Sequence, residues 1–239
     1  LTKQNDNTLF FFFSTGFTIF FFSPFAFLIW DNANFPKVLL QSLDKIIFYL
    51  PGGGYCVGSC NTHKGLIGRM ARAAGHPIIA INYRKAPENP YPAAIEDAVR
   101  VYKQLVEDGY KNIILSGDSA GGGLALATTM VLRDEGFKLP MALVLLSPWT
   151  DLTCSGDSVT RKKDRDALIS PELLEVFAKK YAGKEDLKNP LISPLFGDFT
   201  NFPPTLIQVG TEELLLDDAT RLTKKMKASG VLVEMELWE

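Results

Sequence analysis

The sequence predicts an α/β fold in which a mostly parallel central sheet carries helices on both faces. Short apolar runs of the length of buried strands alternate with stretches of helical length and spacing. One of these runs, 113–115, leads into Gly117-Asp118-Ser119-Ala120-Gly121, which has the strand–turn–helix pattern of a nucleophile elbow. The chain has 239 residues, enough for one large domain with a sizeable core.

The first part of the chain is set apart by its composition. Leu9 to Trp30 is almost continuously apolar, and ten of the 17 phenylalanines lie between Phe10 and Phe27. Two interpretations stay open: a membrane anchor, because about 20 apolar residues span a bilayer as a helix, or the translation of T-rich non-coding DNA. In either case we expect residues 1–44 to lie outside the folded domain, which would comprise residues 45–239.

From residue 45 onward the expected strands are the apolar runs that turn signals bound. Most end at a glycine, a proline or a polar residue, as strands bounded by turns do. They are 46–50, 77–82, the run that begins at 113, 141–146, 205–210 and 232–238.

The expected helices have apolar residues at helical spacing and recognisable ends. Gly75, Gly109 and Gly230 would stop three of them, and Pro92 precedes one. Ser170-Pro171-Glu172 opens another, with serine as the N-cap. The remaining helix follows the elbow. Their ranges are 64–74, 93–108, 121–129, a helix from 171 and 217–229, whereas the polar stretch 156–166 is expected to be a surface loop.

Charge and cysteine content exclude several classes of function. The net charge is −2 and 22% of the residues are charged, so no basic surface indicates a nucleic-acid partner. Cys56, Cys60 and Cys154 are odd in number and lack the spacing of a disulfide framework or a zinc site. We therefore expect reduced thiols and no zinc site at these cysteines. Reduced thiols favour a cytoplasmic location, unless residues 9–30 are a true membrane anchor.

Two glycine-rich turns carry the candidate chemistry. Gly117 and Gly121 have no Cβ, so a strand and a helix can approach closely around Ser119 and expose its hydroxyl. Gly52-Gly53-Gly54 directly follows the strand 46–50, where free backbone N–H groups could bind an oxyanion.

Five motifs in this order resemble the hormone-sensitive-lipase branch of the α/β-hydrolase fold, close to its microbial carboxylesterases. The resemblance covers the chain from Lys45 to its end. The matching segments are Gly52-Gly53-Gly54, Tyr83-Arg84-x-Ala86-Pro87-Glu88, Gly117-Asp118-Ser119-Ala120-Gly121-Gly122, Ser147-Pro148-Trp149-Thr150-Asp151-Leu152 and Gly210-x-x-Glu213-x-Leu215-x-Asp217-Asp218.

The resemblance implies a role for each matching residue. Ser119 would be the nucleophile, and Glu213 would be the acid of the catalytic triad. The N–H groups of Gly53, Gly54 and Ala120 would form the oxyanion hole. The implied enzyme is a serine carboxylesterase that cleaves small or medium acyl esters through an acyl-enzyme, and it is expected to need no metal and no organic cofactor.

Two departures from the family pattern bear on activity. Pro51 stands where the family has the histidine of its glycine loop. Because proline fixes φ and has no N–H, the loop could have a different backbone conformation. The family's base is a histidine about thirty residues past the acid, but only 26 residues follow Glu213. The chain's two histidines, His63 and His76, are expected to be structural, and neither is expected to reach the elbow. We therefore expect the chain to stop a few residues short of its own base.

Two further hypotheses remain beside the esterase. The chain could be a catalytically inactive hydrolase fold that binds a small molecule. Whether a histidine follows Glu239 discriminates this hypothesis from the esterase. It could also be a non-functional gene fragment, which the start at Leu1, the phenylalanine run, Pro51 and the abrupt end favour. Acyl length, natural substrate and oligomeric state are not predicted.

Overall fold

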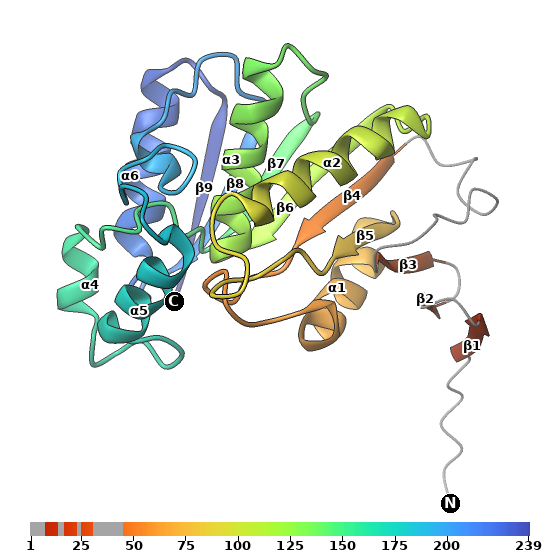
Figure 1. Ribbon diagram of the computed structural model, residues 1–239, viewed down its shortest axis with the longest axis horizontal. Coiled ribbons are helices and arrows are strands. Elements are labelled where there is room, and N and C mark those ends of the chain that lie inside the picture. Colours follow the sequence, from red (N-terminus) through yellow and green to blue (C-terminus); the bar gives the residue numbers. More distant parts are fainter. Residues whose placement is uncertain (1–7, 14–16, 23–24, 31–44) are drawn as a thin grey trace, which may run out of the picture.

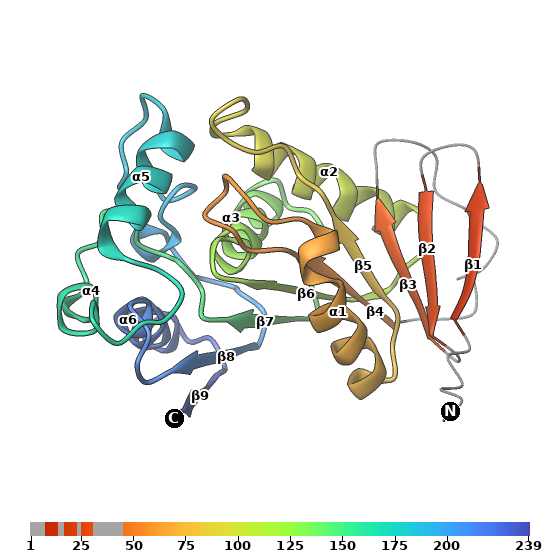
Figure 2. The same ribbon diagram turned by 90° about the horizontal axis from the view of Figure 1, so that it is seen from below.

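The computed structural model describes residues 8–13, 17–22, 25–30 and 45–239. Its central element is a nine-stranded sheet of order β1-β2-β3-β5-β4-β6-β7-β8-β9 (Figures 1 and 2). The strands from β5 to β9 are all parallel, as predicted. Their bounds are β4 Lys45–Leu50, β5 Ile78–Ile81, β6 Asn112–Asp118, β7 Ala142–Leu146, β8 Thr205–Gly210 and β9 Val233–Trp238.

Helices cover both faces of the parallel strands. Side chains alternate along a strand, so Ile46, Phe48 and Leu50 of β4 join one core, while Ile47 and Tyr49 join another. The smaller core lies under α1, and the larger one under α2, α3 and α6; Figure 1 shows α1 and α2 on opposite sides of β4 and β5. The helices are α1 Cys60–Ala74, α2 Ala93–Glu107, α3 Ala120–Asp134, α4 Asp157–Arg161, α5 Pro171–Ala182 and α6 Leu216–Ala228, with a 3-10 turn at Pro194–Phe196.

The described parts of the apolar N-terminal stretch are three strands. They are β1 Thr8–Phe13, β2 Phe17–Phe22 and β3 Phe25–Trp30. β2 pairs antiparallel with both β1 and β3, and β3 pairs parallel with β5 (Figure 2). Across the described ranges, none of the helices has the length and hydropathy of a membrane span. The division of the chain at residue 44 stays a prediction.

Two elements differ from the sequence prediction. α1 begins at Cys60 and not at Lys64, because Ser59 and Thr62 form a capping box: each side chain accepts a hydrogen bond from the other residue's backbone N–H. The polar stretch 156–166 contains α4, which the sequence prediction made a loop. Ser158 in α4 is buried because its hydroxyl donates to the Leu214 carbonyl, at 2.6 Å.

The parallel topology places four connections at one edge of the sheet. The glycine loop follows β4, Ser119 follows β6, Ser147 follows β7 and the Glu213 loop follows β8. Carboxyl ends of parallel strands share an edge, which is where ligands bind in open α/β sheets. The candidate residues therefore come from four strand ends that lie side by side.

Candidate active site

Ser119 lies on a sharp turn between β6 and α3. Its φ of 51° and ψ of −122° are outside the regions that non-glycine residues ordinarily adopt. A Cβ at Gly121 would overlap the Leu50 carbonyl oxygen, and one at Gly117 would overlap the Gly121 carbonyl oxygen. The close approach that the sequence predicted from these glycines is therefore present. It packs the elbow against the end of β4.

The glycine loop touches the elbow and has a backbone shape that requires glycine. The φ values of Gly53 and Gly54 are 124° and 58°. The Tyr83 hydroxyl donates to the Pro51 carbonyl at 2.6 Å, and the Gly52 N–H donates to Asp118 Oδ1 at 2.8 Å. Pro51 follows Leu50, the last residue of β4 paired with β6, so its missing N–H removes no ladder hydrogen bond there.

Ala120 is the first residue of α3 and is fully buried beside the elbow. A backbone N–H in the first turn of a helix has no partner within that helix. The Ser119 carbonyl accepts hydrogen bonds from the N–H groups of Gly122, Gly123 and Trp149. These bonds fix the peptide that joins Ser119 to Ala120, and with it the direction of the Ala120 N–H.

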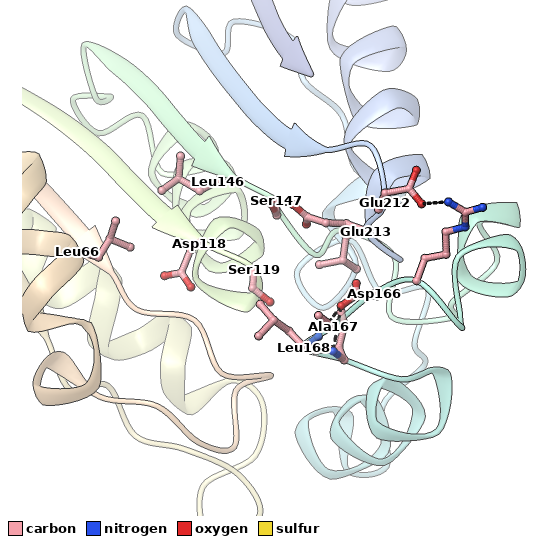
Figure 3. A pocket seen from close by; sticks show the side chains of 13 residues that line it. Leu66, Asp118, Ser119, Leu146, Ser147, Asp166, Ala167, Leu168, Glu212 and Glu213 are labelled. Carbon is pink, nitrogen blue, oxygen red and sulfur yellow. Dashed lines mark hydrogen bonds and ion pairs between the residues drawn. The ribbon is translucent and has the colours of Figure 1, made fainter. Parts of the chain in front are cut away.

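A cavity of about 480 Å³ opens beside Ser119 (Figure 3). Asp118, Ser147, Glu212 and Glu213 line it with Ser119, so the predicted nucleophile and the predicted acid share one cavity. Much of the remaining lining is aliphatic: Leu66, Leu146, Leu168, Ile169 and Leu215.

Glu213 is held by two donors that meet on the same oxygen. The Ser147 hydroxyl lies 2.8 Å from Oε1, and the Gly210 N–H lies 2.7 Å from it. Glu212, which also lines the cavity, pairs instead with Lys162 and Arg165. Asp217 binds the Ser158 N–H, and Asp218 binds the N–H groups of Thr150 and Asp151. Glu212 and Glu213 thus both line the cavity, and Glu213 is the one held by Ser147 and Gly210 at the ends of β7 and β8.

One expectation about the histidines is wrong. His63 reaches the elbow: its Nε2 lies 3.2 Å from Oδ2 of Asp118, the residue before Ser119. The reason is the early start of α1, which puts His63 in its first turn beside β4 and β6. The hydrogen bond with Asp118 raises the pKa of His63 and outweighs burial, which lowers it.

Neither histidine is placed to take a proton from Ser119. The two ring nitrogens of His63 face Asp118 and, at Nδ1, the Ser59 carbonyl and the Thr62 hydroxyl. His76 precedes β5 at the amino edge of the sheet, opposite the cavity. The imidazole nitrogens of the chain are thus either engaged or remote.

Comparisons with known proteins agree with this geometry. Residues 47–239 match the family described as alpha/beta hydrolase fold. An acetyl-hydrolase from Streptomyces hygroscopicus is 45% identical over 81% of this chain and 66% of its own length. An esterase from Acinetobacter venetianus is 40% identical over 82% and 66%, respectively.

Solved structures give the same result. An esterase of the bacterial hormone-sensitive lipase family superposes with a TM-score of 0.80 at 45% identity, covering 82% of this chain and 66% of that one. The chain belongs to the hormone-sensitive-lipase-like esterase family of α/β hydrolases. An esterase/lipase from an uncultured bacterium superposes with a TM-score of 0.82 at 36% identity, over 99% of this chain and 76% of that one.

Family membership confirms the fold that the resemblance implied. The chain spans just under two-thirds of the length of the first two curated relatives, 66% in each case. Sequence reasoning missed three side chains at the site: Tyr49, His63 and Ser147. A signal for His63 was present, because a Ser59-x-x-Thr62 pair favours a helix that starts at residue 60.

Proposed function

We propose that this chain is the body of a serine carboxylesterase that acts on small or medium acyl esters. One observation carries the proposal: Ser119 sits on a strained turn and faces the same cavity as the anchored carboxylate of Glu213. Backbone strain of this kind persists only where the surrounding structure over-determines it, and it concentrates at active sites.

In the first step Ser119 Oγ attacks the carbonyl carbon of the ester. The hydroxyl proton passes to an imidazole, and Glu213 would orient that imidazole and stabilise its positive charge. His63 is engaged with Asp118, and His76 lies at the opposite edge of the sheet. We therefore propose that neither histidine of residues 1–239 supplies this imidazole.

The negative charge that develops on the ester oxygen would be held by the N–H groups of Gly53, Gly54 and Ala120. Each such donor contributes about 3 kcal/mol to lowering the barrier. Collapse of the tetrahedral intermediate expels the alcohol, which takes the proton from the imidazolium and leaves an acyl group on Ser119. Water then attacks the acyl-enzyme by the same route and releases the acid.

The aliphatic part of the cavity supports the substrate class. Leucines and Ile169 form part of the lining of this cavity of about 480 Å³, beside charged residues such as Arg165 and Asp166. The apolar part suits a short or medium hydrocarbon chain.

A fluorophosphonate probe tests the assignment of Ser119. The chain used is residues 1–239 followed by Gly-Met-Trp-His, a family-like continuation that brings an imidazole about thirty residues past Glu213. We expect one adduct, mapped to Ser119 by mass spectrometry, and none in Ser119→Ala. Ser229→Ala, a change at the far end of α6, is the matched control and should label normally.

An adduct on Ser147, which lines the same cavity, would contradict the assignment. Ester binding without any labelling would favour an inactive binding protein.

A further inference from the structure

The Asp118 carboxylate connects three segments next to the candidate nucleophile. Oδ1 accepts hydrogen bonds from the Tyr49 hydroxyl, at 2.6 Å, and from the Gly52 N–H, at 2.8 Å. Oδ2 faces His63 Nε2. Asp118 directly precedes Ser119, and Gly52 directly precedes Gly53. One carboxylate therefore joins the nucleophile turn to the start of the glycine loop.

His63 is oriented to act on this carboxylate. Nε2 points at the carboxylate oxygen, and Nδ1 lies 3.0 Å from the Ser59 carbonyl oxygen. Both oxygens can only accept hydrogen bonds, so an imidazolium, which donates from both nitrogens, satisfies both. His63 is half-buried and its ring lies near that of Tyr49.

We propose that His63 is a positioning residue for the glycine loop. It holds the Asp118 carboxylate in place, and that carboxylate fixes the Gly52 N–H and so the direction of the next two peptides. The inference rests on the proposed function only in taking the Gly53 and Gly54 N–H groups as the oxyanion donors. His63 would touch no substrate and would act through Asp118.

The loop needs such an anchor because its own sequence restrains it little. Three consecutive glycines have more conformational freedom than any other residues. The loop histidine of the family is replaced here by Pro51, which has no side-chain donor. Removing His63 would leave the half-buried Asp118 carboxylate without its cationic partner, which favours rotation or protonation of that group.

In the described part of the chain, Asp118 forms its ion pair with His63, and the other cation of this cluster is Lys85, whose Nζ lies 5.0 Å from the centre of the Tyr83 ring. The titratable side chains that face the pair are Tyr49 of β4, Tyr83 after β5 and Cys60 of α1. Burial above all raises the pKa of Tyr49 and of Tyr83, and both tyrosines are neutral at physiological pH. Between about pH 5 and 8, where an ordinary histidine titrates, the charge of this cluster therefore changes through His63.

Amide hydrogen exchange of the glycine loop tests the proposal without any need for activity. Residues 1–239 are compared as wild type, His63→Ala, His63→Gln and His76→Ala, with exchange at Gly52 and Gly53 followed by NMR. We expect exchange at Gly52 to be about 10-fold faster in His63→Ala, because loss of the anchor lowers the free energy of local opening. His63→Gln should stay near wild type, since its amide can donate to Asp118. His76→Ala is the control and should change nothing.

Kinetics on the chain extended with Gly-Met-Trp-His provide the second readout. We expect His63→Ala to lower kcat by about 10-fold with little change in KM, because misplaced donors affect the transition state most. His63→Gln should restore most of kcat. Unchanged Gly52 exchange in His63→Ala would overturn the proposal, as would a loss of kcat that merely follows the folded fraction. If no variant hydrolyses esters, the proposed function fails, and the exchange data still decide the role of His63.

Discussion

The Ser147 hydroxyl donates a hydrogen bond of 2.8 Å to Oε1 of Glu213. Ser147 does so from a strained backbone, with a φ of 45°, at the carboxyl end of β7. The Gly210 N–H binds the same oxygen, so Oε2 receives no hydrogen bond from the described part of the chain. An acid of a catalytic triad needs one oxygen turned toward its imidazole, and this arrangement provides it.

Replacing Ser147 with alanine should weaken catalysis and leave binding intact. A hydrogen bond to a charged group contributes about 1.5–3 kcal/mol. Without the Ser147 hydroxyl the Glu213 carboxylate is less firmly oriented, which should lower kcat about 10-fold or more and leave KM nearly constant. Both constants are measured by steady-state hydrolysis of p-nitrophenyl butyrate with the chain followed by Gly-Met-Trp-His, and Ser229→Ala is the control. An unchanged kcat would show that Gly210 alone orients Glu213.

The His63–Asp118 pair should make stability depend on pH in a defined window. The pKa of His63 is raised by its hydrogen bond to Asp118, so its contribution is full below the ordinary value of 6.5 and is lost as pH rises through the folded pKa. For Asp118, burial alone would raise the pKa, but hydrogen bonds from His63 and Tyr49 lower it overall. Its contribution is full above the ordinary value of 3.8 and is lost as pH falls through the folded pKa.

Urea unfolding of wild type and His63→Gln across this range measures the effect. The difference in the free energy of unfolding should be largest between the two ordinary pKa values, 3.8 and 6.5. It should shrink on both sides of that interval. A difference independent of pH would mean that the pair is not ionised in the folded protein.

Asp218 should make the folded protein less stable as pH rises, whereas a carboxylate with a lowered pKa makes it more stable. Burial raises its pKa to about 7, against the hydrogen bonds it accepts from the Thr150 and Asp151 N–H groups. The folded state therefore binds an extra proton between the ordinary pKa of 3.8 and about 7, and stability falls as pH rises through that window.

Asp218→Asn should remove this dependence while its amide oxygen still accepts both N–H groups. Relative to wild type, we expect the variant to gain stability between pH 4 and pH 8, measured by thermal unfolding. Asp164→Asn removes an exposed charge and is the matched control. A wild-type protein that becomes more stable than Asp218→Asn at high pH would contradict the raised pKa.

The parallel sheet, its helices and the meeting of four strand ends could be predicted from residue 45 onward. Apolar runs and glycine turns are local signals, and parallel topology then determines which edge they share. α4 could not be predicted because Ser158 is held by Leu214 and Asp217, which lie more than 50 residues away. The Ser147–Glu213 and His63–Asp118 contacts join different strand ends and helices, so local patterns do not show them. The pairing of β3 with β5 is equally non-local.

Ester hydrolysis by the chain with and without an appended C-terminal histidine tests the central claim most directly. The claim is that Ser119 is the nucleophile and that neither His63 nor His76 is its base. We predict that residues 1–239 hydrolyse p-nitrophenyl acetate or butyrate near background, because a serine hydroxyl is a poor nucleophile without an adjacent base. The same chain followed by Gly-Met-Trp-His should gain activity by orders of magnitude and lose it in Ser119→Ala. Robust turnover by the unextended chain, abolished by His63→Ala or His76→Ala, would contradict the account.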